Sequence, residues 1–121
     1  KKEFQKSGLM REKEKIICTE YFQKSYSNSA PEKLLFLAVI LQALLDATKP
    51  KEQRESDTSI VARDQAKAWF FATVGVTCSN FEQVCENAGL EPTYVRGFAY
   101  KVLESKEIQY VRKRINKILN N

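Results

Sequence analysis

Apolar and polar positions along this 121-residue chain follow the period of an α-helix almost throughout. Apolar residues at i, i+3, i+4 and i+7 give a helix one apolar face that can be buried. By this criterion the predicted helices are residues 12–26, 29–48, 58–73, 79–88, 92–104 and 106–120. We therefore predict an all-α protein, a single compact five- to six-helix domain at residues 12–121, with a basic flexible lead-in at residues 1–11.

The second predicted helix has the clearest start signal and the most apolar sequence. Ser29 and Glu32 have the S-x-x-E spacing of a capping box, and Pro31 suits the first helical turn. The run Leu34–Leu45 is apolar around nearly the whole helix, so we expect other helices to cover it. As a helix it spans about 18 Å, less than the roughly 30 Å of a bilayer core. It is predicted to be a core helix, with no contact with a membrane.

Helix starts are also predicted further along the chain. Asp57 or Thr58 can cap the third helix, which follows a charged connector. Ser79 and Glu82 form a second S-x-x-E pair, so we predict that the fourth helix begins at Ser79.

Residues 79–105 carry the most specific pattern in the chain. The fourth helix should end at Gly89, which adopts the left-handed conformation at low cost. Leu90 can fill the angle between two helices, and Pro92 suits the first position of the fifth helix. The expected structure is two helices joined by a tight turn.

This pattern resembles the helix-turn-helix of bacterial and phage DNA-binding proteins. Counting Phe81 as the first residue of that motif, its constrained positions are filled by Val84, Cys85, Ala88, Gly89, Leu90, Val95 and Phe98. The resemblance covers about 25 residues and implies a helix-turn-helix at about 80–104. More loosely, the chain is similar to small uncharacterised helical proteins of phages and bacteria, a likeness that implies no function.

The resemblance makes the fifth helix the recognition helix, whose outward side chains enter the major groove. The expected outward residues are Thr93, Tyr94, Arg96, Gly97, Tyr100 and Lys101. Arg96 is the first candidate for a base contact, because a guanidinium can bind guanine with two hydrogen bonds. Lys101 should contact a phosphate, and Gly97 allows close approach. Glu91 argues against DNA, since a carboxylate repels phosphate.

The C-terminal segment combines an apolar stripe with basic residues. Ile108, Val111, Ile115 and Ile118 lie nearly opposite the apolar face of the fifth helix, so either the chain breaks near Ser105 or one long helix has two apolar faces. The stripe resembles a coiled-coil seam, from which we expect a homodimer through the C-terminal helix. The basic residues expected to contact phosphate, or to form a solvated face, are Lys106, Arg112, Lys113, Arg114 and Lys117.

The net charge and its distribution along the chain favour a partner rich in phosphate. The net charge is +5, and residues 91–121 contribute seven basic and three acidic side chains. A basic end of this kind is typical of proteins that bind the nucleic-acid backbone.

The sequence lacks histidine, the commonest general base and metal ligand, and shows no nucleophile–base pair or glycine-rich phosphate loop. The chain has no histidine and three cysteines without a C-x-x-C pair, so we predict no metal site, no cofactor and no enzymatic activity. Buried free thiols are typical of a reducing compartment, which favours a cytoplasmic protein.

Two functions remain open at this stage. The first is a transcriptional regulator that binds double-stranded DNA through the helix-turn-helix. The second is a helical interaction module that docks on RNA polymerase or another regulator.

Overall fold

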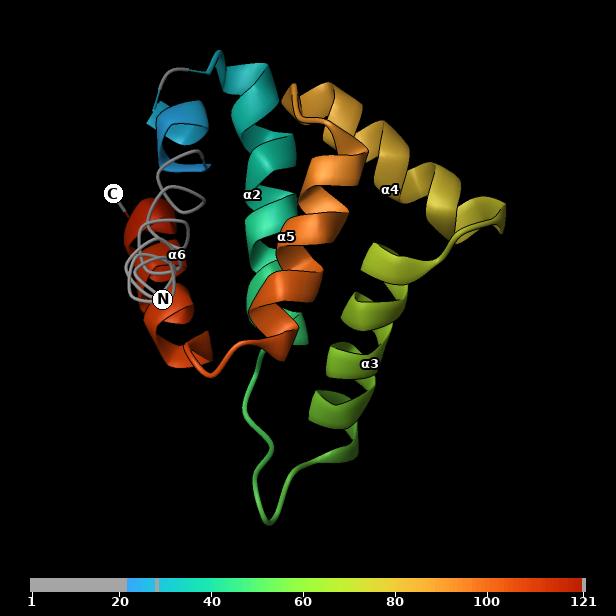
Figure 1. Ribbon diagram of the computed structural model, residues 1–121, viewed down its shortest axis with the longest axis vertical. Helices are drawn as coiled ribbons and strands as arrows, with labels where there is room; N and C mark the ends of the chain where they lie inside the picture. The colour runs from blue at the N-terminus through green and yellow to red at the C-terminus, as the bar shows by residue number, and fades with distance from the viewer. Residues whose placement is uncertain (1–21, 28, 121) are drawn as a thin grey trace, which may run out of the picture.

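The computed structural model describes residues 22–27 and 29–120, and every regular element in these residues is a helix (Figure 1). Residues 22–27 are helical and precede α2 (Pro31–Ala47), α3 (Asp57–Phe71), α4 (Gly75–Ala88), α5 (Pro92–Glu104) and α6 (Ile108–Leu119). The prediction of a compact all-α domain is confirmed. The predicted lead-in at residues 1–11 and most of the predicted first helix lie outside the described residues.

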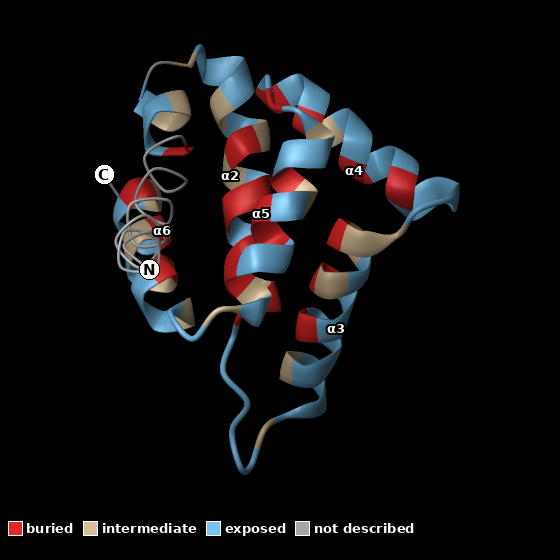
Figure 2. Ribbon diagram, in the orientation of Figure 1, coloured by how far each residue is buried: buried red, intermediate tan, exposed pale blue. Residues whose placement is uncertain are grey.

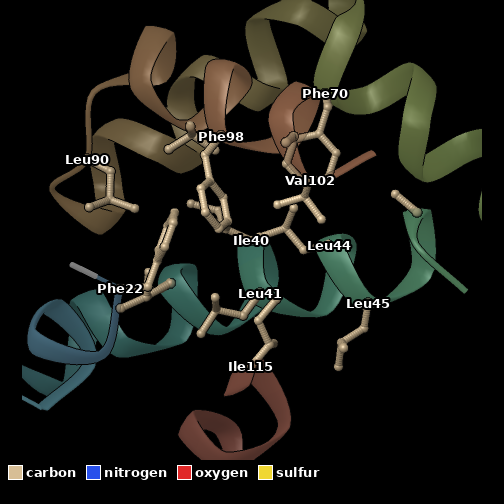
Figure 3. Close-up of a cluster of buried hydrophobic side chains, with 14 of the residues drawn as sticks. Phe22, Ile40, Leu41, Leu44, Leu45, Phe70, Leu90, Phe98, Val102 and Ile115 are labelled. Carbon is tan, nitrogen blue, oxygen red and sulfur yellow. The ribbon is translucent and has the colours of Figure 1, made fainter. Parts of the chain in front are cut away.

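Helix α2 is the centre of the fold, and it contacts α3, α4 and α6. One face of α2 is completely buried, with Leu37, Ile40 and Leu41 each 0% exposed. Phe98 of α5 lies over Ile40 on one side of α2, and Ile115 of α6 lies against the other side (Figure 3). The hydrophobic core therefore consists of two layers of side chains, one on each side of α2.

The outer face of α2 is not covered by the described residues (Figure 2). Leu35 is 66% exposed and Val39 is 43% exposed, so the helices of the described residues cover α2 except on this face. None of the helices in the described residues combines the length and apolar character needed to cross a membrane.

The predicted capping box of α2 is not formed. The N-cap residue is Ala30, with no hydrogen bond from a side chain to the first turn, while the Ser29 hydroxyl donates to the carbonyl of Ser25. Pro31 occupies the first position of the helix as predicted. Proline and the apolar face are therefore sufficient to define this helix start.

Helix α3 is capped one residue earlier than the sequence suggests. The Ser56 hydroxyl accepts a hydrogen bond from the amide of Ser59 at 3.1 Å, and Asp57 is the first helical residue. Asp57 then places a carboxylate in the first turn, where the helix dipole favours negative charge.

Helix α4 begins a full turn before the predicted residue Ser79, at Gly75. Gly75 has φ 90°, and the N-cap residue Val74 gives no side-chain hydrogen bond. The additional turn buries Cys78, which is 7% exposed, inside the helix that Ser79 was expected to start. The second S-x-x-E pair therefore lies in a helix interior, and its prediction as a cap is wrong.

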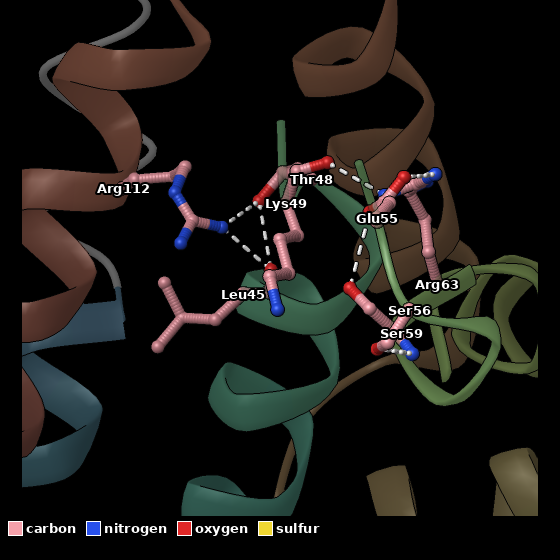
Figure 4. A network of polar contacts seen from close by, with 8 residues as sticks. All are labelled: Leu45, Thr48, Lys49, Glu55, Ser56, Ser59, Arg63 and Arg112. Atoms are coloured by element: carbon pink, nitrogen blue, oxygen red, sulfur yellow. Dashed lines mark hydrogen bonds and ion pairs between the residues drawn. The ribbon is translucent and has the colours of Figure 1, made fainter. Parts of the chain in front are cut away.

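The connector between α2 and α3 is held by one buried ion pair (Figure 4). Arg63 binds the carboxylate of Glu55 with both terminal nitrogens, one of them at 2.8 Å, and it also donates to the carbonyl of Lys49 at 3.4 Å. The hydrogen bonds from Arg63 lower the pKa of Glu55 from its ordinary value of 4.5 to about 2. A charged connector is thereby fixed to α3.

The chain breaks between α5 and α6, which confirms the first of the two alternatives for the C-terminal segment. The amide of Glu107 donates to the Ser105 hydroxyl at 2.7 Å in this turn. The turn brings the stripe of Val111, Ile115 and Ile118 onto α2, and each of these residues is at most 3% exposed. The seam expected to join two subunits is therefore covered within one chain.

Candidate nucleic-acid interface

The turn between α4 and α5 has the predicted conformation. Gly89 adopts φ 78° and ψ 25°, the left-handed region that favours glycine. The amide of Leu90 donates to the carbonyl of Cys85 at 2.9 Å, and the amide of Gly89 donates to Glu86 at 3.0 Å. These two bonds satisfy the last carbonyls of α4 and set the direction in which the chain enters α5.

The apolar positions of the motif form the inside of this corner. Leu90 is 5% exposed, Val95 is 0% exposed, and Phe98 is 6% exposed. Cys85 is 0% exposed, and burial raises the pKa of its thiol to about 12. The small thiol side chain therefore packs as an apolar group between the helices and is not ionised at neutral pH.

Arg96 does not point outward from α5. Its Nε donates to the carbonyl of Phe70 at 2.8 Å, and one terminal nitrogen donates to the carbonyl of Ala72 at 3.1 Å. Its guanidinium carbon also lies 4.9 Å from the centre of the Phe81 ring. The expectation that Arg96 is an outward base reader does not agree with this geometry, because its donors are used at the end of α3.

The other candidates on α5 do form an exposed face. Thr93, Gly97 and Lys101 are exposed, and Tyr100 is 60% exposed. Tyr94 is 37% exposed, and its ring centre lies 6.3 Å from that of Phe22. A β-carbon added at Gly97 would have no atom within 4 Å, so packing within the described residues does not require glycine there.

The electrostatic character of this corner is unfavourable for phosphate. The exposed acidic residues of α4, α5 and the turn are Glu82, Glu86, Glu91 and Glu104. Lys101 is the one exposed cation in the same span of residues, 75–104, because Arg96 is turned inward. The negative charge expected only from Glu91 therefore extends along α4 and α5, although the exposed Lys33 of α2 lies beside the turn at Gly89.

Helix α6 is positively charged, in contrast to α4 and α5. Its twelve residues include four basic side chains and no acidic one. Lys113 and Lys117 are exposed one turn apart, and Arg114 lies beside them. Lys106 is exposed just before the helix begins. We refer to Lys106, Lys113, Arg114 and Lys117 as the α6 basic face.

Arg112 belongs to the same helix but not to this face. Its terminal nitrogen donates to the carbonyl of Leu45 at 2.6 Å and to the hydroxyl of Thr48 at 3.0 Å (Figure 4). The Thr48 hydroxyl itself donates to the carbonyl of Leu44 at 2.6 Å. The prediction of a phosphate contact for Arg112 does not fit these bonds, which join α6 to the C-terminal end of α2.

Two neighbours of the basic face were missed at the level of sequence. The ring of Tyr110 lies 5.9 Å from the guanidinium carbon of Arg114, and its spacing of four residues was the available signal. Gln23 lines a pocket together with Arg114 and Lys117. No sequence signal joins Gln23 to α6, because about ninety residues separate them.

In the described part of the chain, no three histidine, cysteine or acidic side chains are grouped closely enough to hold a metal ion. Comparison of the chain with protein-family models, with curated proteins and with solved structures gave no match.

Proposed function

We propose that the protein binds double-stranded DNA and that the α6 basic face makes the main contact with the phosphate backbone. The observation that carries this proposal is the contrast in charge between the two candidate surfaces. The α6 basic face presents three cations on a helix without acidic residues and Lys106 just before it, beside the exposed N-cap residue Glu107, whereas α4, α5 and the turn between them expose four carboxylates and one lysine. Phosphate binding depends on cations that remain free of internal partners.

The role of α5 in this proposal is narrower than the resemblance implies. Without Arg96, the side chains that can reach a base edge are Thr93, Tyr100 and Lys101. Gly97 lies between them and would allow a close approach of the helix backbone to DNA. Specific reading of the major groove, and with it a role in transcription regulation, therefore depends on a small and mostly uncharged surface.

The experiment is the binding of a fluorescently labelled 20-base-pair duplex, measured by anisotropy at several salt concentrations. Four phosphate contacts give a slope of log K against log salt of about −3.6, that is, a roughly 150-fold loss of affinity between 50 and 200 mM salt. The double variant Lys113→Gln/Lys117→Gln should reduce the slope to about −1.8 and the loss to roughly 12-fold, because two contacts are removed.

The matched control is the double variant Lys49→Gln/Lys51→Gln, which removes two exposed lysines from the connector after α2. Its net charge equals that of the α6 variant, but its slope should remain that of the unmodified protein. Equal slopes for the two variants would show that only net charge matters. An unmodified protein that does not bind at 50 mM salt would exclude DNA binding.

The second candidate function is the helical interaction module, docking on RNA polymerase or another regulator. The exposed face of α2 favours it, because Val39 lines a groove between α2 and α3, and Leu35 is exposed one turn before Val39 on the same helix. A contiguous apolar surface of this kind is typical of protein contacts. Binding through it should persist as salt rises, and Leu35→Ser should weaken it without changing the affinity for DNA.

A further inference from the structure

A pocket lies between residues 22–27 and α6. Among the described residues, its walls are Gln23 from the first segment and Arg114, Lys117 and Ile118 from α6. Its volume is about 350 Å³. A water molecule takes about 30 Å³ in the liquid, so the pocket has room for a small anion together with several waters.

The polar groups that the described residues contribute to this pocket can all act as hydrogen-bond donors. Arg114 offers a planar set of N–H groups, Lys117 offers an ammonium, and Gln23 offers its amide nitrogen. The ring of Tyr110 lies near the guanidinium of Arg114 and restricts its position. Ile118 is 3% exposed and forms an apolar wall without charge.

The two cations of the pocket are not neutralised by the described residues. No ion pair of Arg114 or Lys117 is found there, and α6 contains no carboxylate. Two like charges side by side repel each other, so an anion between them gains from both. A phosphate group suits this arrangement, because it has several acceptor oxygens and up to two negative charges.

We infer that this pocket is a phosphate-binding site, in which Arg114 and Lys117 bind the phosphate oxygens and Gln23 donates a further hydrogen bond. The phosphate can come from the backbone of bound DNA or from a free phosphate-containing molecule. The first source depends on the proposed function, whereas the second does not. The inference is specific to Lys117 and Arg114, and Lys113 does not line the pocket.

The test is thermal unfolding of the full chain in increasing inorganic phosphate, with ionic strength held constant by chloride. Phosphate stabilises many proteins by exclusion from their surface, so the comparison between variants decides the result. A specific site gives a rise in Tm that grows with the logarithm of the phosphate concentration above Kd and is about 5 °C at ten times Kd. We expect Lys117→Gln to lose this rise and Lys113→Gln, which changes the net charge equally, to keep it.

The same rise in all three proteins would overturn the inference, because it would reflect surface exclusion and not a site. The two sources are separated by adding phosphate to the labelled duplex complex. Displacement of DNA from the unmodified protein, weaker in Lys117→Gln, assigns the pocket to a backbone phosphate. A Lys117-dependent rise in Tm without any binding of the duplex would support the pocket and reject the proposed function. Duplex binding without a Lys117-dependent rise in Tm would reject the pocket alone.

Discussion

Arg96 gives the sharpest test of the structure, because sequence and structure assign it opposite roles. As a base reader it would contribute to DNA affinity and little to stability. In the structure it donates hydrogen bonds to two carbonyls at the end of α3 and lies over the ring of Phe81. Hydrogen bonds from a charged donor contribute about 1.5 kcal/mol each at the lower end of their range. The cation–π contact adds about 0.5 kcal/mol at a partly exposed site.

Arg96→Ala should therefore lower the free energy of unfolding by about 3.5 kcal/mol, which for a domain of this size lowers Tm by roughly 14 °C. The measurement is urea and thermal unfolding followed by circular dichroism. Lys101→Ala on the exposed face of the same helix is the control, and its stability should change by less than about 0.5 kcal/mol. An Arg96→Ala protein with unchanged stability but more than tenfold weaker DNA binding would refute the assignment.

Three further predictions concern backbone conformation, pH and thiol reactivity. In urea unfolding, Gly89→Ala should lose about 1–2 kcal/mol because φ is 78°, whereas Gly97→Ala in an open helix position should gain up to about 1 kcal/mol; equal effects would contradict the turn. Because the pKa of Glu55 is lowered to about 2, the stability from its pair with Arg63 is present above pH 4.5 and lost as pH falls towards 2. Glu55→Gln should remove this part of the acid dependence of Tm, and an unchanged pH profile would argue against the pair. In a variant whose only cysteine is Cys85, with a thiol pKa of about 12, Ellman's reagent should react only as the protein unfolds, and rapid reaction at pH 7 would contradict its burial.

The corner between α4 and α5 could be predicted because its signals are local. Gly89 is needed for a positive φ, and Pro92 suits a first helical turn, so each residue restricts the backbone at its own position. The apolar spacing on either side then fixes which faces meet. The cap of α2 and the first residues of α3 and α4 were less predictable. The S-x-x-E pattern also occurs in helix interiors, as at Ser79, where packing of Cys78 extends the helix.

The directions of the arginine side chains could not be predicted from the period of the helix. Arg96 and Arg112 both lie at the border between the apolar and polar faces of their helices. From such a position a long side chain can extend into solvent or reach across to a neighbouring helix. Only the position of the neighbouring helix decides between these two directions of the side chain. That position depends on contacts between residues far apart in the sequence.

These arginines have a common physical role. The last turns of α2 and α3 contain no basic residue, although their C-terminal carbonyls favour a cation. Arg112 donates to Leu45 near the end of α2, and Arg96 donates to Phe70 at the end of α3. Each helix thus receives its compensating charge from a segment distant in sequence.

This role changes the meaning of the positive charge in residues 91–121. Two of the seven basic side chains there, Arg96 and Arg112, are bound to carbonyls of the fold. Of the other five, only Lys101 lies on α5, and four form the α6 basic face. By sequence, two of these seven cations lie on α5 and five lie on or just before α6, and the internal bonds of Arg96 and Arg112 leave one and four. A backbone contact that depends on free cations should therefore follow α6, whatever the exposed face of α5 contributes to reading bases.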